Sequence, residues 1–368
     1  MKEALEVLRI IEKKGFLAYI VGGYVRDYCL KRESLDIDIC TNATPKDILD
    51  IFDNVLVDDK QYGAVKVYYQ GNKYDITTFR KDIKYVDNRR PIKIKYVNDL
   101  KTDLLRRDFT INTLCIDKNG KIIDLLNVKN DLYKKVIKTV GNPRYRIKED
   151  ALRILRAIRF ATTLDFDIDE KTKFYIKKYG YLLKKLSYTR KKEELMKIFA
   201  SINKAKGIDL LLELGLHKHL EITKLTNNIS TNNVIGIWSI LEVDDKYPFS
   251  KLEREQMRKI RQLLQLELFD SYNIYSFGLY LSTIVADIKQ LDKKKLNLIY
   301  NSLPIYNRRD IVISPVEVAN ILKKKPDKYL TEIFNDIEKK IIYKTLNNNK
   351  NDIIKYCLKK YGGDGNEK

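Results

Sequence analysis

Few residues in this chain can ligate a transition metal or form a disulfide. Four cysteines are scattered along 368 residues without a Cys-x-x-Cys pair, and only two histidines occur, His217 and His219. This supply supports neither a zinc site nor a disulfide framework. The sequence also has no run of eighteen apolar residues, so it predicts no membrane-spanning helix. We therefore expect a reducing, cytoplasmic setting without membrane attachment.

Acidic residues are too few to balance the basic ones. The chain has 71 Lys and Arg against 50 Asp and Glu, a formal net charge of +21, which suits a polyanionic partner. The excess is local, because residues 1–50 hold 8 basic and 9 acidic side chains whereas residues 151–200 hold 13 and 6. The second stretch is either a track for a nucleic-acid backbone or a solvated basic face.

The chain is longer than one typical domain, and its 44% hydrophobic content can form substantial cores, so we expect two to four modules. Short strand-like runs occur early, whereas beyond about residue 145 apolar residues recur at helical spacing. The predicted fold class is α+β, with a small mixed β-sheet head followed by an all-α remainder. The expected strands cover residues 18–21, 35–40, 64–69, 73–78, 113–117 and 121–124.

Other segments of the chain also carry local signals of their structure. Residues 1–16 predict an amphipathic helix rather than a signal peptide. Three prolines interrupt the last third, which indicates a change of module near residue 290. Residues 362–368 have a composition typical of disorder. The clearest helical segments after the head are residues 151–161, 193–202 and 208–214.

Two aspartates in alternate positions, Asp36 and Asp38, mark the most informative stretch. On a β-strand they project from the same face, while the alternating Leu35, Ile37 and Ile39 face the core. Two adjacent carboxylates repel each other unless a cation lies between them. The pair therefore predicts a site for Mg²⁺, which favours carboxylate and phosphate oxygens.

A double glycine, Gly22 and Gly23, lies just upstream of this pair. It predicts a turn whose backbone N–H groups approach phosphate oxygens without a Cβ in the way. Arg26, at the start of the next helix, is expected to clamp a triphosphate. A lone Gly-Gly is usually a turn and a lone Asp-x-Asp is usually a solvated strand edge. Their joint occurrence at this spacing indicates the metal site of a nucleotidyltransferase.

Further charged motifs follow. Asp75, on the expected strand 73–78, is either a third carboxylate of a two-metal centre or a surface aspartate. In the run Arg106-Arg107-Asp108, forked donors and an acceptor suit a phosphate and a ribose hydroxyl. The alternative for this run is an ordinary salt-bridge cluster at a strand end.

A series of one aspartate and three arginines begins after residue 149. Asp150, Arg153, Arg156 and Arg159 recur at three-residue intervals, so successive members are neighbours along a slowly turning helix stripe. A polar stripe is usually the wet face of a helix. Its position directly after a triphosphate site indicates a binding role instead. The residues expected to pack behind it are Leu152, Leu155 and Ile158.

Taken together, these motifs resemble one family. GGYVRD, LDIDIC, DITTFR, DNRRP, DLLRRDFTIN and EDALRILRAIRFA occur in the order and spacing of class II tRNA nucleotidyltransferases, the CCA-adding enzymes, especially the bacterial form. These enzymes belong to the nucleotidyltransferase and poly(A) polymerase superfamily. The match covers roughly residues 1–200 and is highly specific. The remainder fits the family only in length and helical character.

The resemblance implies template-independent addition of C, C and A to the 3′ end of tRNA from CTP and ATP, with release of pyrophosphate. It implies no protein partner. The implied division is a nucleotidyltransferase head at residues 1–138, a base-recognising neck at 139–200, a body at 201–290 and a tRNA-binding tail at 291–368.

The resemblance also assigns roles to individual residues. The family usually carries glutamate where Asp75 stands, so the reach of this shorter side chain to the metals stays open. The implied roles are metal binding by Asp36 and Asp38, triphosphate binding by Gly22, Gly23 and Arg26, nucleotide binding by Arg107 and Asp108, base recognition by Asp150 and Arg153, and support of the nucleotide and its phosphates by Arg156 and Arg159.

Base recognition by Asp150 and Arg153 has a simple chemical logic. Cytosine and adenine both present an amino donor beside a ring-nitrogen acceptor, so a carboxylate next to a guanidinium can pair with either. Uracil and guanine present the reverse order and would leave buried polar groups unpaired, at about 1–3 kcal/mol for each group. A protein can thus act as its own template.

The products depend on a loop. Relatives specialised for CC addition lack part of the loop between the third carboxylate and the Arg-Arg-Asp run, and the segment from Thr78 to Asp103 is undeleted. Full CCA addition is therefore favoured over CC addition. An A-adding enzyme or poly(A) polymerase is the alternative within the family. A non-catalytic RNA-binding protein is the alternative from another class, although a pure binder has no need of metal carboxylates.

Overall fold

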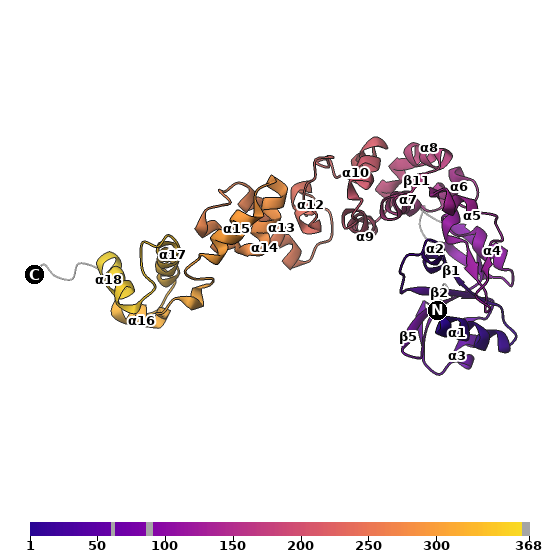
Figure 1. Cartoon of the computed structure of the whole chain (residues 1–368), viewed down its shortest axis with the longest axis horizontal. Coiled ribbons are helices and arrows are strands. Elements are labelled where there is room, and N and C mark those ends of the chain that lie inside the picture. The colour runs from indigo at the N-terminus through magenta and orange to yellow at the C-terminus, as the bar shows by residue number, and fades with distance from the viewer. Residues whose placement is uncertain (60–62, 86–90, 363–368) are drawn as a thin grey trace, which may run out of the picture. The chain divides into compact units, whose positions relative to one another are not determined.

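A computed structural model describes residues 1–59, 63–85 and 91–362 of the chain. Residues 363–368, where disorder was expected, and residues 86–90 of the segment from Thr78 to Asp103 therefore lie outside the described residues. The chain divides into two compact units (Figure 1), one formed by residues 1–227 with 246–248 and the other by residues 228–245 with 249–368.

The first unit is built on a mixed β-sheet. Among the described residues, seven strands pair in the order β3-β4-β5-β2-β1-β8-β9. β2 and β5 run parallel, and the other neighbouring pairs are antiparallel. The strands are β1 (Ala18–Val21), β2 (Ile37–Thr41), β3 (Val55–Asp59), β4 (Ala64–Tyr69), β5 (Asn72–Thr78), β8 (Cys115–Ile116) and β9 (Ile122–Ile123).

The sheet forms because its central strands are rich in β-branched and aliphatic residues whose side chains are buried, including Ile20, Val21 and Ile39. Helix α1 (Lys2–Lys13) covers it with an apolar stripe, and Figure 1 shows α1 beside α3 (Pro45–Ile51). A second small core, which includes Val21, Phe79 and Leu104, joins the sheet to α4 (Leu100–Leu105).

Helix α4 follows a β-hairpin formed by β6 (Arg80–Tyr85) and β7 (Pro91–Tyr96). Asp99 caps the helix by accepting hydrogen bonds from the backbone N–H groups of Lys101 and Thr102. The helix ends at Leu105, so the Arg106-Arg107-Asp108 run begins at its C-terminus. This short helix fixes the position of the run relative to the sheet.

Helices occupy most of the remaining first unit. A two-residue parallel pairing of β10 (Val136–Ile137) with β11 (Asp167–Ile168) departs from the expected all-α remainder, although the overall α+β class is confirmed. The helices are α2 (Gly23–Cys29), α5 (Lys129–Tyr133), α6 (Pro143–Glu149), α7 (Leu152–Leu164), α8 (Glu170–Tyr179), α9 (Tyr188–Phe199), α10 (Lys204–Glu213) and α11 (Leu216–His219), with 3-10 turns η1 (Thr110–Asn112) and η2 (Gly180–Lys185).

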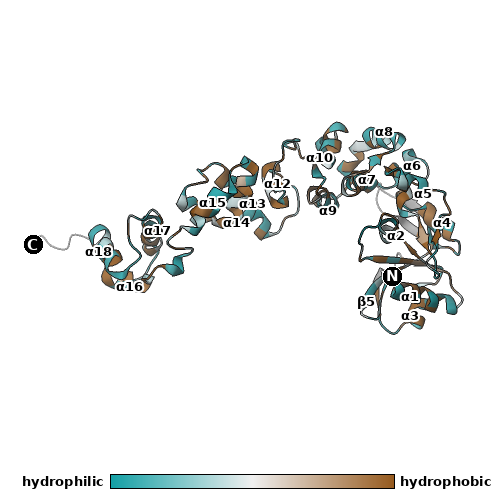
Figure 2. Cartoon of the chain, in the orientation of Figure 1, coloured by the Kyte–Doolittle hydropathy of each residue, from teal (hydrophilic) through white to brown (hydrophobic). Residues whose placement is uncertain are grey.

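The second unit is helical over its described residues. Its core includes Ile260, Leu263 and Ile337, all fully buried, and Figure 2 shows both hydrophobic and hydrophilic residues along these helices, as expected for amphipathic elements. No helix among the described residues is long and apolar enough to span a membrane. The helices are α12 (Val234–Leu241), α13 (Lys251–Leu264), α14 (Ser271–Lys289), α15 (Lys293–Asn301), α16 (Pro315–Ile321), α17 (Tyr329–Ile342) and α18 (Lys350–Tyr361), with the 3-10 turn η3 (Arg308–Asp310).

The strand predicted at residues 35–40 was wrong in its start, and those predicted at 113–117 and 121–124 are shortened to two residues each. β2 begins at Ile37 rather than Leu35, so Asp36 lies just before the strand and Leu35 is 95% exposed instead of buried. The pairing of β2 with β5 starts only at Ile37, which aligns with Tyr74. Sequence alternation alone could not show where that pairing ends.

Gly207 on α10 tests how tightly the first unit is packed. A Cβ at this position would lie 2.4 Å from Thr162 Oγ1 and 2.6 Å from Ile198 Cγ2. Both neighbours are β-branched and cannot swing away easily. We expect Gly207→Ala to lower the free energy of unfolding by about 1–3 kcal/mol, as overpacking does, measured by urea denaturation.

The control for this substitution is Ala205→Gly, at an exposed position of the same helix. It should cost up to about 1 kcal/mol through helix propensity alone. Greater stability of the Gly207→Ala protein would show that helix propensity, and not close packing, decides the effect at this position.

Candidate active site

Most of the predicted nucleotide-binding residues line one pocket of about 320 Å³ in the first unit. Six guanidinium groups face three carboxylates there, so the pocket is strongly cationic and suits an anionic ligand. Its lining comes from β6, from the turn after α4, from the α6–α7 junction and from α9. The lining residues are Arg80, Asp82, Arg106, Arg107, Asp108, Asp150, Leu152, Arg153, Arg156 and Arg190.

Arg107 joins this pocket to the predicted metal-binding strand. A Cβ at Gly22 would lie 3.2 Å from Asp38 Oδ2 and 3.8 Å from Arg107 Nη1, so these three residues meet at one point. Gly22 also has a φ of +83°, a left-handed conformation that favours glycine. A side chain at this position would be strained and would crowd both charged groups.

Two of the predicted carboxylates, Asp75 and Asp36, act on Asp38 through their charge. In the parallel pairing of β2 with β5, Asp38 aligns with Asp75, whose carboxylate lies 3.4 Å from Lys73 Nζ. Desolvation by the surrounding protein raises the pKa of Asp38, nearby Arg107 opposes this, and Asp75 and Asp36 raise it further. A cation among these carboxylates would relieve their mutual repulsion.

The donor set fits a divalent metal by its chemistry, because hard cations such as Mg²⁺ prefer carboxylate oxygens. Within the described residues, however, no three His, Cys, Asp or Glu side chains are arranged to hold an ion. Asp38 and Asp75 are therefore the pair that the fold aligns. Asp36, which precedes β2, acts on Asp38 through its charge.

Asp103 holds the two arginines of the Arg106-Arg107 run, and our sequence analysis missed it. Its fully buried carboxylate accepts hydrogen bonds from Arg106 Nε at 2.8 Å, from Arg107 Nη2 at 3.2 Å and from the Arg80 backbone N–H at 3.1 Å. Burial raises its pKa, but Arg107 and Arg106 outweigh this and hold the pKa below its usual value. The i, i+3 and i+4 spacing from Asp103 was the available signal.

Arg26 is held by the protein itself. Its guanidinium bonds both carboxylate oxygens of Asp27, at 2.8 and 2.9 Å, and donates from Nη1 to Asn112 Oδ1 at 2.9 Å. It also lies over the ring of Phe160, 5.2 Å from the centroid. Arg26 is in the middle of α2 rather than at its start, and two of its five N–H groups remain for a ligand.

Asp108 is saturated with hydrogen bonds. Its oxygens accept from the Phe109 backbone N–H, from Asn112 Nδ2 and from two nitrogens of Arg156, which occupies the four acceptor positions of a carboxylate. Burial raises its pKa, but Arg156 outweighs this and holds the pKa well below its usual range. A ribose hydroxyl could bind here only in exchange for one of these partners.

Asp150 has a partner that the sequence did not reveal. It follows α6 as its C-cap, with an extended backbone, so it lies outside the helix that carries the three arginines. Its Oδ1 accepts from the Leu152 N–H at 3.0 Å, and its Oδ2 lies 3.7 Å from Arg190 Nη2 of α9. Burial raises the pKa of Asp150 and Arg190 opposes the rise.

Arg153 is buried against the junction of α6 and α7. Its Nη1 donates to the Arg146 carbonyl and to Glu149 Oε2, and its Nη2 lies 3.5 Å from the Arg106 carbonyl. Nε and one N–H of Nη2 remain for a ligand. Arg146 also donates to the carbonyls of Arg106 and Arg107, so the α6–α7 junction is hydrogen-bonded to the backbone of the arginine run.

The charged residues that were expected to form one stripe on the helix have separate partners instead. Arg156 pairs with Asp108 in the pocket, whereas Arg159 pairs with the buried Glu194 of α9 at 2.6 Å and does not line the pocket. Leu155 and Ile158 are buried as expected. Leu152 was expected behind the stripe but lines the pocket instead, because α7 begins only at that residue.

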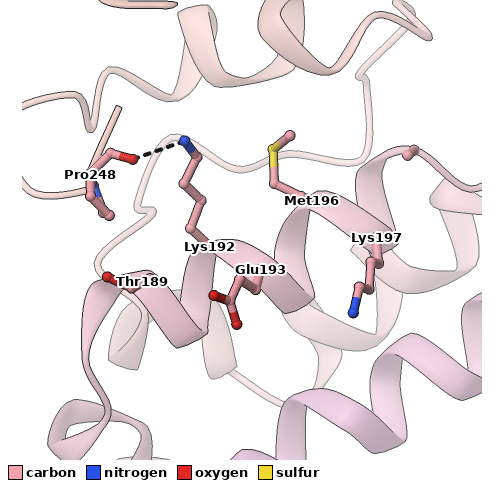
Figure 3. Close-up of a pocket in the computed structure, with 7 residues that line it drawn as sticks. Thr189, Lys192, Glu193, Met196, Lys197 and Pro248 are labelled. Carbon is pink, nitrogen blue, oxygen red and sulfur yellow. Dashed lines mark hydrogen bonds between the residues drawn. The ribbon is translucent and has the colours of Figure 1, made fainter. Parts of the chain in front are cut away.

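A second, mostly apolar pocket of about 640 Å³ lies along the outer face of α9. Figure 3 shows Lys192, Glu193, Met196 and Lys197 on the helix, with Lys192 Nζ donating to the Pro248 carbonyl at 2.8 Å. The neighbouring Lys191 is only 2% exposed, so it belongs to the interior and not to the basic surface of this region.

Three family models match successive parts of the chain. The "Poly A polymerase head domain" matches residues 18–138, and the "Probable RNA and SrmB-binding site of polymerase A" matches residues 165–225. The "tRNA nucleotidyltransferase domain 2" matches residues 245–357. The pocket residues from β6 and from the turn after α4 therefore lie within the first match. Those of the α6–α7 junction lie between the first two matches, and Arg190 of α9 lies within the second.

Similarity to known proteins extends over nearly the whole chain. A CCA-adding enzyme of Lactococcus lactis subsp. cremoris (strain SK11) is 36% identical, with 94% of this chain and 93% of the relative covered. One from Bacillus cytotoxicus is 31% identical over 96% of each. The crystal structure of the Bacillus stearothermophilus CCA-adding enzyme in complex with CTP superposes with a TM-score of 0.87 at 26% identity, covering 97% of this chain and 96% of that one. The chain belongs to the family of CCA-adding enzymes.

Proposed function

We propose that this chain adds C, C and A to the 3′ end of tRNA without a nucleic-acid template, using CTP and ATP and releasing pyrophosphate. The observation that carries the proposal is the cationic pocket, which gathers Arg107, Asp108, Asp150, Arg153 and Arg156 and meets the Asp38 carboxylate through Arg107. The likeness to CCA-adding enzymes along 94% of the chain supports the same activity. We also propose a cytoplasmic location, since tRNA, CTP and ATP are available there.

A divalent metal is usual for this nucleotidyltransferase family, and we propose Mg²⁺ held by Asp36 and Asp38, with Asp75 as the third carboxylate. When bound, such an ion would lower the pKa of the tRNA 3′-hydroxyl and neutralise charge on the leaving pyrophosphate. The family usually has glutamate at position 75. The shorter Asp75 aligns with Asp38, so it can act either as a metal ligand or through its charge alone.

The arginines would bind and orient the triphosphate. Arg107 Nε is buried without a hydrogen-bond partner among the described residues, and its Nη1 faces the junction with Gly22 and Asp38. An unpaired buried N–H is costly, and a phosphate oxygen would satisfy it. Gly23 and Arg26 border the same turn. Positioning and electrostatic stabilisation would supply most of the rate.

Base selection would fall to Asp150 and Arg153. Asp150 keeps acceptor capacity for the amino group of cytosine or adenine, and Arg153 keeps donors on Nε and Nη2 for the ring nitrogen. Arg190 and Glu149 would hold the two reading groups in place. Arg156, tied to Asp108, and Arg159, tied to Glu194, would support the nucleotide from the helix behind.

We propose the division into head (1–138), neck (139–200), body (201–290) and tail (291–368), with tRNA held along the last three. The matched RNA-binding model at residues 165–225 supports this for the neck. Lysines 171, 177, 178, 184 and 197 are exposed there. They would contact phosphates of the acceptor stem.

An A-adding enzyme or a poly(A) polymerase is the second candidate, because the model that matches residues 18–138 is that of a poly(A) polymerase head. One assay separates the candidates. The protein is incubated with tRNAs that end before CCA, after C and after CC, with single labelled nucleotides. Incorporation of C on the first two and of one A on the third supports CCA addition, whereas A alone or a long A tail supports the alternative.

The carboxylates give the first test of the proposal. We expect Asp38→Asn to lower incorporation at least about a thousandfold, because the group would be a direct metal ligand, while tRNA binding in a filter assay stays unchanged. Asp75→Ala should be milder, and Asp75→Glu should remain active. Asp53→Ala, an exposed acid of the same unit, is the control. Near wild-type turnover of the Asp38 variant would remove the residue from the metal site.

Base reading gives the second test. Arg153→Ala should lose selectivity for C and A over U and G as well as rate, whereas Arg26→Ala should slow all four nucleotides alike. Single-turnover incorporation of each nucleotide on tRNA ending before CCA and after CC measures both effects. Unchanged selectivity in the Arg153 variant would mean that another group reads the base.

Salt dependence of tRNA binding gives the third test. Lys177→Gln with Lys184→Gln should weaken binding and lower the slope of log K against log salt by about 0.7–0.9 for each lysine that contacts a phosphate. Lys46→Gln, exposed on α3, serves as the control. An unaltered slope in the double variant would assign these lysines to a solvated face.

A further inference from the structure

Asn112 lies between two charged groups that the reaction would use. It is 7% exposed, at the end of η1. Its Oδ1 accepts from Arg26 Nη1 at 2.9 Å, and its Nδ2 donates to Asp108 Oδ1 at 3.2 Å. One carboxamide therefore connects an arginine of α2 to the carboxylate that follows α4.

The carboxamide is suited to this position by its chemistry. It can accept from a guanidinium with its oxygen and donate to a carboxylate with its nitrogen at the same time. An ionised aspartate could accept from Arg26 but would repel Asp108. A leucine of similar size could do neither, and glutamine would be one methylene too long for the same two contacts.

The connection continues to the pocket. The second oxygen of Asp108 accepts from Arg156 Nε at 2.7 Å, and Arg156 lines the pocket. Arg26 and Arg156 also lie over the same ring, with guanidinium carbons 5.2 and 5.5 Å from the centroid of Phe160. Two arginines from distant parts of the sequence are thus fixed relative to each other through Asn112, Asp108 and one aromatic face.

We propose that Asn112 is a positioning residue for nucleotide binding, which holds Arg26 and the Asp108–Arg156 pair in one arrangement so that both act on the same nucleotide. This inference rests on the proposed function. It assigns no contact between Asn112 and the substrate. Its effect passes through the two groups that the amide bridges.

The first experiment removes both hydrogen bonds. Asn112→Leu should raise KM for CTP and for ATP about tenfold or more, since each lost bond involves a charged group, while the choice of C and A over U and G is kept. Thr110→Val is the matched control in the same 3-10 turn. The Thr110 hydroxyl is buried without a partner among the described residues, so its loss should leave KM unchanged.

The second experiment gives a readout that loss of structure would not produce. Asn112→Asp keeps the acceptor for Arg26 but sets a second carboxylate against Asp108. The other charged groups nearby are Arg26, Asp27, Arg156 and Arg159. When one of the two carboxyls is protonated, it can again donate to the other. The activity of this variant relative to wild type should therefore rise several-fold between pH 8 and pH 6.

The outcomes are distinct. A folded Asn112→Leu protein with KM within twofold of wild type overturns the inference, and so does a flat activity ratio across pH for Asn112→Asp. If the leucine variant does not fold, the pH ratio of the aspartate variant decides. Wild-type protein that incorporates no nucleotide on tRNA ending before CCA would instead overturn the proposed function itself.

Discussion

Repulsion among crowded guanidinium groups is the constraint that shapes this site. Six arginines line one pocket of about 320 Å³, and like charges so close together cost free energy unless each has a partner. The fold meets this constraint by giving the arginines carboxylates or carbonyls: Asp103 for Arg106 and Arg107, Asp108 for Arg156, and Glu149 for Arg153. The cationic surface that remains is what an anionic nucleotide would meet.

These pairings also explain why short elements suffice to build the site. α4 has only six residues, yet Asp103 fastens it to the start of β6 and to both arginines that follow. The α6–α7 junction bonds the carbonyls of the same run through Arg146 and Arg153. Removal of one buried charge would leave its partner unpaired, so the network is expected to be more sensitive than the apolar core to single substitutions.

Much of the site could be predicted from local sequence, because its motifs are contiguous. The Gly-Gly turn, the Asp-x-Asp pair and the Arg-Arg-Asp run each lie within a few residues, and β1 and β4 have the expected bounds. Alternation of residue types shows which faces a strand has, but not where its pairing stops. For this reason Leu35 was expected in the core and is exposed.

The partners of the arginines could not be predicted in the same way. Asn112 lies 86 positions from Arg26, and Glu194 lies 35 from Arg159, so only the folded chain brings them together. Asp103 did have a local signal, because it stands three and four residues before its arginines. The burial of Lys191 had one too, because Lys191 shares the buried face of α9 with Leu195 and Ile198 at helical spacing.

The hydrogen bonds of the free site bear on how it would bind. Asp108 has no acceptor position left, and Arg26 and Arg153 each spend most of their donors on the protein. At Asp108 a nucleotide would therefore exchange with an internal partner, whereas at Arg26 and Arg153 it would use the N–H groups that remain, and the arginines would already stand near their working positions. Such exchange lowers the entropic cost of ordering long side chains, since that cost is met on folding. It also favours ligands that replace every hydrogen bond they displace. A phosphate and a matching base edge can do so, whereas a mismatched base edge cannot.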